Sequence, residues 1–226
     1  MNQPLEDVMR RVDKLYDARA HLENVRASVS NLEEIEDTSD YEVAWRLGRA
    51  LFFLGQEAQS KEETRACHAR AVRVCKLAAR AQPGRVEGHF WLGVNLALLA
   101  QVENTFNALR KALHARRSLT RAVRIDPLYH AAGPLRVLGR LQHRLPRLLG
   151  GGIARARGNF ERAIKLAPEN TVTRIYLAEM MLEIGEENRA RHELEDLLKA
   201  PLDPAWAFES ARDKEKARRM LDEMRH

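Results

Sequence analysis

The chain has 226 residues, with 45% hydrophobic and 31% charged residues and a net charge of +6, which is the composition of a globular protein large enough for one domain or a repeat array. Glycine (12) and proline (8) are few, and the abundant residues are strong helix formers. No alternating run of β-branched residues predicts a strand, so an all-helical chain is favoured.

The N-terminal flank, residues 4–40, precedes the regular part of the chain. Its apolar residues recur at helical spacing, first at Val8, Val12 and Leu15 and then at Val25, Val29 and Leu32. This spacing predicts one or two amphipathic helices that pack against whatever follows.

Residues 41–202 repeat one pattern of small, large and small residues that ends in a proline. The small residues would let two helices lie close, the larger residue would fill the gap, and the proline would end the second helix. The pattern predicts helix pairs at about 41–85, 86–129, 130–170 and 171–202. Its members are Ala71, Cys75, Ala78 and Pro83; Ala115, Leu119, Ala122 and Pro127; Ala156, Phe160, Ala163 and Pro168; and, incompletely, Ala190, Leu194 and Leu197.

The pairs differ in length. The first two carry about ten extra helix-compatible residues, near 56–65 and 101–110, which predicts elongated helices rather than long loops. In the third pair the first helix is expected to start at Gly133-Pro134, because proline suits the first helical turn. Residues 203–226 begin with Asp203-Pro204 and continue as a charged segment, which predicts a C-terminal capping helix.

The repeated pattern resembles the tetratricopeptide repeat (TPR), a helix–turn–helix unit that buries its apolar face only by stacking on its neighbours. The predicted fold is therefore all-α: a single right-handed α-solenoid domain of tetratricopeptide type over residues 1–226. Its first two helix pairs are elongated, and capping helices lie at both ends.

Three stretches carry a narrower resemblance. They are Glu87-Gly-His-Phe-Trp-Leu-Gly93, Ile125-Asp-Pro-Leu-Tyr-His-Ala-Ala-Gly-Pro-Leu-Arg-Val-Leu-Gly-Arg-Leu141 and Phe160-Glu-Arg-Ala-Ile-Lys-Leu-Ala-Pro-Glu-Asn170. In this order they look like the bacterial T-component family of TRAP-type solute transporters, over about residues 40–200. The core is also similar to the eukaryotic regulators of microtubule dynamics. The resemblance implies a non-enzymatic repeat protein that partners a periplasmic solute-binding protein, with an apolar path between helices as a proposed ligand route.

In a tetratricopeptide array the first helix of each pair lines the concave face. Twelve of its inward positions are candidate binding residues: Glu42, Trp45, Arg49, Phe52, Glu87, Phe90, Val94, Arg136, Arg140, His143, Ile175 and Glu179. They would form a groove for an apolar or amphipathic ligand, with Arg136 or Arg140 holding a carboxylate. The alternative is that the aromatic residues are core packing and that the arginines pair with Glu42, Glu87 and Glu179.

Charge is distributed unevenly along the chain. Residues 110–157 contain twelve Lys or Arg and one acid, Asp126, for a net charge of +11, so the remainder is net acidic. Such an imbalance attracts anionic partners, and we expect a protein with an acidic surface first. A small organic acid or lipid is an alternative ligand, and nucleic acid is disfavoured because no aromatic platform interleaves with the charges. The other alternative is that the charges are scattered around the solenoid.

No catalytic motif, phosphate-binding loop or paired metal ligand is present in the sequence, which predicts no enzyme activity, no cofactor and no metal. The predicted function is a protein–protein interaction adaptor. The alternatives are a carrier of a small apolar or carboxylate ligand in a channel between helices, and a structural or cytoskeletal regulator. The oligomeric state is left open.

The expected location is the cytoplasm, because the first residues contain no apolar segment of the signal-peptide kind. A periplasmic location is the alternative if an export signal has been removed. The longest apolar run, residues 91–100, is too short to span a bilayer, so no transmembrane segment is expected.

Overall fold

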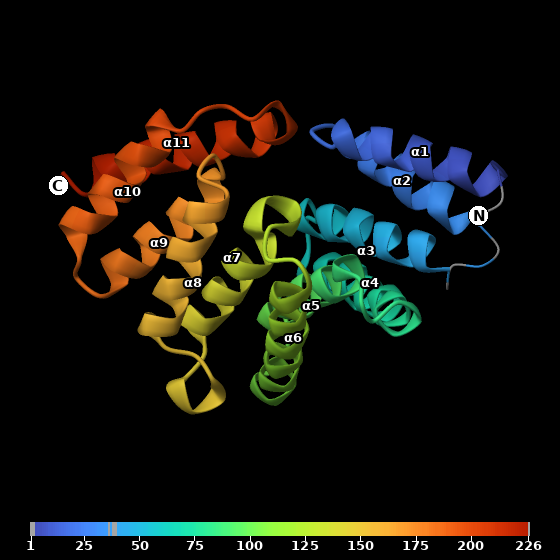
Figure 1. Cartoon of the computed structure of the whole chain (residues 1–226), viewed down its shortest axis with the longest axis horizontal. Helices are drawn as coiled ribbons and strands as arrows, with labels where there is room; N and C mark the ends of the chain where they lie inside the picture. The colour runs from blue at the N-terminus through green and yellow to red at the C-terminus, as the bar shows by residue number, and fades with distance from the viewer. Residues whose placement is uncertain (1–2, 36, 38–39, 226) are drawn as a thin grey trace. The chain divides into compact units, whose positions relative to one another are not determined.

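The computed structural model describes residues 3–35, 37 and 40–225. Over these residues the chain forms eleven α-helices, two short 3-10 turns and no strand, which confirms the all-helical prediction. The chain divides into two compact units, Met1–Asp126 and Pro127–His226 (Figure 1). The prediction that both belong to one solenoid domain stays a prediction.

The first unit is a stack of three helix pairs. Consecutive helices pack against each other, and α3 also contacts both α1 and α5, so these first helices line one side of the unit. Helices α4 and α6 have 21 residues each, against 13 in α10, which confirms the elongation of the first two repeats. The helices are α1 (Gln3–Asp17), α2 (Leu22–Glu33), α3 (Tyr41–Gln56), α4 (Lys61–Ala81), α5 (Val86–Gln101) and α6 (Thr105–Ile125).

The second unit contains two helix pairs and a capping helix. Helix α11 packs on both α9 and α10 and places Ala217 and Leu221 in the same apolar cluster as Leu194. It therefore covers the apolar side that the last pair would otherwise expose, as a capping helix does. The helices are α7 (Tyr129–Arg144), α8 (Ile153–Leu166), α9 (Thr171–Glu183), α10 (Glu187–Lys199) and α11 (Ala207–Glu223), with 3-10 turns at Arg147–Leu149 and Pro204–Trp206.

The repeated small residues lie where helices approach most closely. Each glycine in the middle of a first helix faces the large residue of the repeated pattern on the second helix. An added Cβ would overlap Cys75 Sγ at Gly48, and it would lie 2.6 Å from Leu119 Cγ at Gly93 and 2.9 Å from Phe160 Cε1 at Gly139. The repeat spacing therefore reflects packing: a glycine on the first helix leaves room for the larger side chain on the second helix.

Helix α7 begins with a left-handed turn that the sequence predicts only in part. His130, Ala131 and Ala132 have φ of 55°, 51° and 56°, so the right-handed helix starts at Gly133, close to the predicted Gly133-Pro134 start. Left-handed backbone is unfavourable for residues with a Cβ atom. The turn is held in part by Arg136, whose Nη1 donates to Ala131 O at 2.8 Å.

In the described part of the chain, none of the helices has both the length and the apolar character needed to cross a membrane. Both cysteines are free thiols; Cys75 is buried, whereas Cys67 is partly exposed.

Candidate functional site

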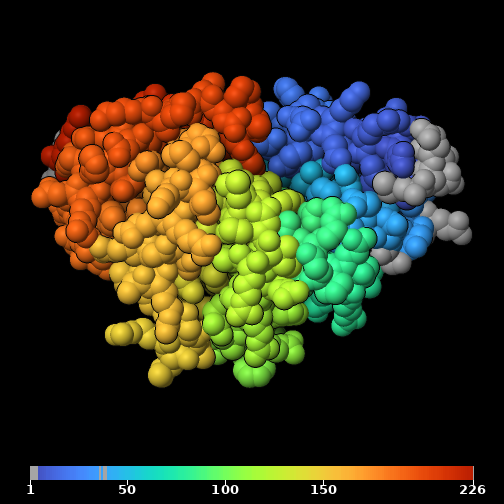
Figure 2. All heavy atoms as spheres, in the orientation of Figure 1, coloured from blue at the N-terminus to red at the C-terminus, as the bar shows by residue number. Residues whose placement is uncertain are grey.

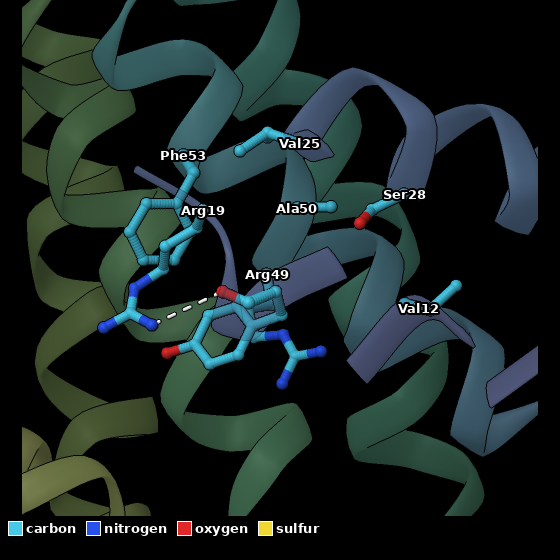
Figure 3. Close-up of a pocket in the computed structure, with 8 residues that line it drawn as sticks. Val12, Arg19, Val25, Ser28, Arg49, Ala50 and Phe53 are labelled. Atoms are coloured by element: carbon cyan, nitrogen blue, oxygen red, sulfur yellow. Dashed lines mark hydrogen bonds between the residues drawn. The ribbon is translucent and has the colours of Figure 1, made fainter. Parts of the chain in front are cut away.

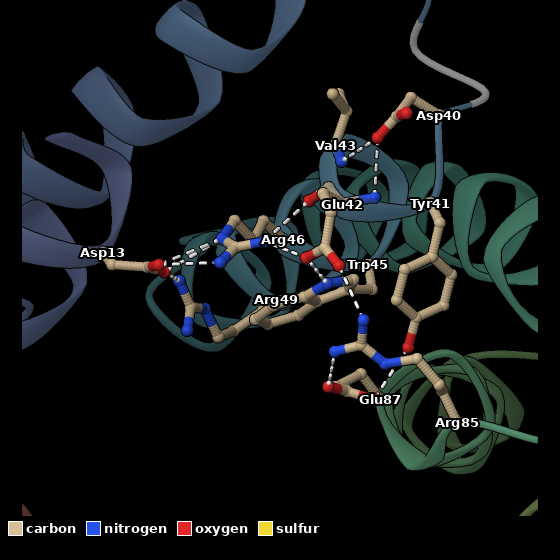
Figure 4. Close-up of polar contacts among 10 residues, drawn as sticks. All are labelled: Asp13, Asp40, Tyr41, Glu42, Val43, Trp45, Arg46, Arg49, Arg85 and Glu87. Carbon is tan, nitrogen blue, oxygen red and sulfur yellow. Dashed lines mark hydrogen bonds and ion pairs between the residues drawn. The ribbon is translucent and has the colours of Figure 1, made fainter. Parts of the chain in front are cut away.

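Four of the predicted binding residues, Glu42, Trp45, Arg49 and Glu87, lie in a polar network along α1, α3 and α5 (Figure 4). Asp40 caps the N-terminus of α3, the helix that carries the centre of the network. Its Oδ1 accepts from the backbone N–H of Glu42 at 2.8 Å and of Val43 at 3.3 Å. An acidic N-cap satisfies the free N–H groups of the first turn and fixes where the helix begins. Glu42, Trp45 and Arg49 then follow on the side of α3 that faces its neighbouring first helices.

One half of the network joins α3 to α1 through Asp13. Arg46 Nη2 lies 2.8 Å from Asp13 Oδ2, and Arg49 Nη2 lies 2.8 Å from Asp13 Oδ1. Arg46 Nη1 also pairs with Glu42 Oε2 at 2.5 Å. Arg49 is buried, and its guanidinium stacks on the Tyr16 ring with Cζ 3.8 Å from the ring centroid.

The other half joins α3 to α5 through Arg85. Its Nη1 pairs with Glu42 Oε1 at 2.7 Å, and its Nη2 pairs with Glu87 Oε1 at 2.6 Å. The Tyr41 hydroxyl donates to Glu87 Oε2 at 2.7 Å, and Trp45 Nε1 donates to Glu42 Oε2 at 3.0 Å. Every oxygen of the Glu42 and Glu87 carboxylates therefore has a partner within the unit.

The network keeps its carboxyl groups ionised. Burial alone would raise the pKa of Asp13, but hydrogen bonds from Arg46 and Arg49 outweigh burial, and the pKa is lowered. The same balance lowers the pKa of Glu42 and of Glu87. Burial and the Glu87 carboxylate raise the pKa of Tyr41, so its hydroxyl stays protonated as a donor. These groups hold helices together as fixed charges and are not poised to transfer protons near neutral pH.

Acid should therefore weaken the first unit through this network. A carboxyl group whose folded pKa lies below its unfolded value contributes stability above the unfolded pKa, and that stability is lost as pH falls through the folded pKa. The free energy of unfolding, measured with urea between about pH 6 and pH 3, should fall more steeply for the wild type than for a variant carrying Asp13→Asn, Glu42→Gln and Glu87→Gln. Equal pH dependence in the two proteins would show that the three carboxylates do not stabilise the fold.

A small hollow opens beside the network, between α1, α2 and α3 (Figure 3). Two guanidiniums contact the Tyr16 ring: Arg19 Cζ lies 4.6 Å from its centroid, and Arg49 stacks on it as described above. Arg19 is itself held by Tyr16 O at 3.3 Å. The hollow has about 10 Å³ of space for the centre of a water molecule, which is room for about one water. It therefore gives no support to the carrier alternative.

The second unit has a comparable set of ion pairs on α7, α9 and α11. Glu179 lies 2.6 Å from Arg140 Nη2 and 2.5 Å from Lys216 Nζ, so it links all three helices. His143 Nε2 lies 3.0 Å from Glu183, and burial lowers the pKa of this histidine despite that neighbour. Arg136 is buried and donates to Asn170 Oδ1 at 3.2 Å as well as to the left-handed turn.

The structure brings four of the predicted residues into one network, namely Glu42, Trp45, Arg49 and Glu87. Four others belong to the apolar interior or its edge, where Phe90, Val94 and Ile175 are buried and Phe52 is half-buried. The remaining four, Arg136, Arg140, His143 and Glu179, belong to the second unit and contact partners there. Their role as a ligand groove stays a prediction, and packing and pairing within the chain account for all twelve positions.

The expected pairing of an arginine with Glu179 is present, through Arg140, but sequence reasoning missed the other partners that complete these networks. Arg49 pairs with Asp13 rather than with a predicted glutamate, whereas Glu42 and Glu87 pair with Arg46 and Arg85. Counting only the inward positions of the repeats leaves out α1 and the helix edges where these residues lie. The spacing of Arg46 and Arg49, one turn apart on α3, was the available signal.

Comparison with known proteins agrees with this architecture. The structure is similar to that of TTC0263, a thermophilic TPR protein of Thermus thermophilus, with a TM-score of 0.67, 21% sequence identity and 97% of each chain covered. At that identity the likeness shows the fold alone, which is the α-solenoid of helix pairs. No curated protein sequence matches the chain. The model of the family described as TRAP transporter T-component matches residues 37–226, and the chain therefore belongs to the TRAP transporter T-component family.

Proposed function

We propose that this chain is a non-enzymatic adaptor that binds the solute-binding protein of a TRAP-type transporter. The observation that carries the proposal is the family match over residues 37–226 of a chain built from stacked helix pairs. Stacked pairs give an extended surface with no need for a closed pocket, and repeat proteins use such surfaces to hold other proteins.

The state of the titratable groups supports a binding role rather than catalysis. The carboxylates on the first helices are ion-paired, and the pKa of Asp13, Glu42, Glu87 and Glu179 is lowered, each by hydrogen bonds and nearby cations that outweigh burial. A general acid or base works best with a pKa near the working pH, and these groups are held away from that range. A partnership with a solute-binding protein would place the chain in the periplasm, the alternative location weighed from the sequence.

The test is direct binding between purified proteins. The full chain is titrated with the solute-binding protein encoded beside a TRAP permease in the same genome, and the dissociation constant is measured by isothermal calorimetry. We expect a saturable complex of defined stoichiometry, checked by light scattering after gel filtration. A solute-binding protein of an unrelated transporter class is the control, and equal binding of both, or of neither, would contradict the proposal.

A further inference from the structure

Helices α4 and α6 of the first unit carry a strongly basic surface on the side away from their partner helices. We call it the outer basic face and define it by seven residues. They recur at helical spacing opposite the buried small residues of each helix, so they share one exposed side. They are Arg73, Lys76 and Arg80 of α4, and Arg110, Arg117, Arg121 and Arg124 of α6.

Both helices pack on α5, and side chains of each reach the loops beside the other. Arg65 of α4 donates to Val102 O just before α6 at 2.7 Å, and Arg121 of α6 donates to Pro83 O just after α4 at 3.3 Å. Burial lowers the pKa of His114 on α6, and the cations of Lys76 on α4 and Arg117 on α6 lower it further. Both helices reach the surface in the space-filling view, α4 in blue-green and α6 in yellow-green (Figure 2).

The charges of this face are not neutralised. Among the residues that the structure describes, no acidic side chain forms an ion pair with any of the seven cations. Three arginines later in the basic stretch differ: Arg140, Arg144 and Arg157 pair with Glu179, Glu183 and Glu186. The even scattering of charge considered from the sequence therefore does not describe this helix pair. Clustered like charges cost folding stability, and a binding partner of opposite charge removes that cost.

Exposed apolar side chains lie among the cations. Phe106 is 77% exposed at the start of α6, and Leu77 and Leu109 are 39% and 37% exposed beside Lys76 and Arg110. Arginine and large apolar residues together are the composition of protein–protein interfaces, whereas lysine is depleted there. Six of the seven cations are arginine, whose planar guanidinium pairs with carboxylates through two parallel hydrogen bonds.

From these observations we infer that the outer basic face is the docking surface for an acidic region of a protein partner. This inference rests on the proposed function: the solute-binding protein would bind at the outer basic face, through an acidic surface of its own. An anionic membrane is the competing occupant of a basic face. The dominance of arginine over lysine and the presence of a single strongly exposed aromatic favour the protein.

The experiment compares two charge-reversed full-length variants that have the same net charge. One carries Arg73→Glu, Arg117→Glu and Arg121→Glu on the outer basic face. The matched control carries Arg189→Glu, Arg218→Glu and Arg219→Glu, which lie in exposed ion pairs of the second unit. Circular dichroism melting checks that both variants fold, and the same solute-binding protein is the probe.

The outer-face variant should bind the probe at least about 30-fold more weakly than the wild type, whereas the control should stay within about 3-fold, because close complementary charges contribute strongly to an interface and remote ones do not. Wild-type binding that both variants retain would overturn the docking face and leave the proposed function standing. If the wild type fails to bind, the proposed function falls and the docking face falls with it. Tight binding to vesicles of about 30% phosphatidylglycerol in phosphatidylcholine, lost in the outer-face variant while probe binding persists, would overturn the protein partner in favour of a membrane.

Discussion

Replacing Phe90 with alanine should lower the free energy of unfolding by about 3–5 kcal/mol, which is the usual loss when a fully buried aromatic ring leaves a cavity. Phe90 is 2% exposed, and its ring meets Trp91 edge to face with the centroids 4.9 Å apart. Trp91 in turn contacts Phe52 and Phe53, so the ring beside Phe90 belongs to an aromatic cluster of the first unit. Urea unfolding followed by circular dichroism measures the loss.

The matched control is Phe106→Ala, the same substitution in the same unit. Phe106 is 77% exposed, so its removal should change the free energy of unfolding by no more than about 0.5 kcal/mol. Phe90 was a candidate for ligand contact from its position in the repeat. A Phe90→Ala variant as stable as the control would show that the ring is not core packing and would return it to the ligand groove.

Replacing Gly88 with alanine should destabilise the first unit by about 1–3 kcal/mol, although alanine is the better helix former. Gly88 lies in the first turn of α5, and an added Cβ would lie 2.7 Å from Ala79 N and 3.0 Å from Ala78 C. These atoms are backbone of α4 and cannot rotate away as a side chain can. The helices would have to separate, and the melting temperature should fall.

Gly158 offers the opposite case with the same chemistry. It lies inside α8, and an added Cβ would meet nothing within 4 Å. The Gly158→Ala variant should therefore gain about 0.5–1 kcal/mol from the smaller entropy of the unfolded chain. If both glycine variants changed stability in the same direction, close helix approach would not be the reason for glycine at position 88.

The helix pairs were predictable because their signal is local and repeated. The spacing of Ala115, Leu119 and Ala122 recurs with the same offsets in other pairs, and it reports a contact between helices that are neighbours in sequence. The start of α7 was nearly predictable from Gly133-Pro134 because proline restricts the backbone locally. The left-handed turn before it was not, because nothing about His130, Ala131 or Ala132 favours that conformation on its own.

The polar network was not predictable from the repeat because its partners are set by tertiary approach. Asp13 pairs with Arg46 and Arg49 across 33 and 36 residues, from a helix outside the repeated pattern. Arginine side chains are long, so they also reach partners several residues away from the positions that the repeat count predicts. The repeat count predicts that Glu42 and Arg49 lie on one side of α3, but it could not say which charge each would meet.

Only part of the outer basic face could be predicted from the sequence. The cations of α6 lie in the basic stretch 110–157, but those of α4, such as Arg73 and Arg80, lie about forty residues earlier. Only the fold, in which α4 and α6 both pack on α5, brings them near each other. The pairing of Arg140, Arg144 and Arg157 with acidic residues of later helices separates them from that face, and this separation also depends on the fold.

Hydroxyl-radical footprinting of the complex with the solute-binding protein tests most directly whether the partner binds the outer basic face or the first helices. The exposed side chains of Phe106, Leu77 and Leu109 should become protected from oxidation in the complex, and Phe208 of α11, which is 45% exposed, should not change. Protection of Tyr16 on the first helices, with Phe106 oxidised as fast as in the free chain, would contradict the account.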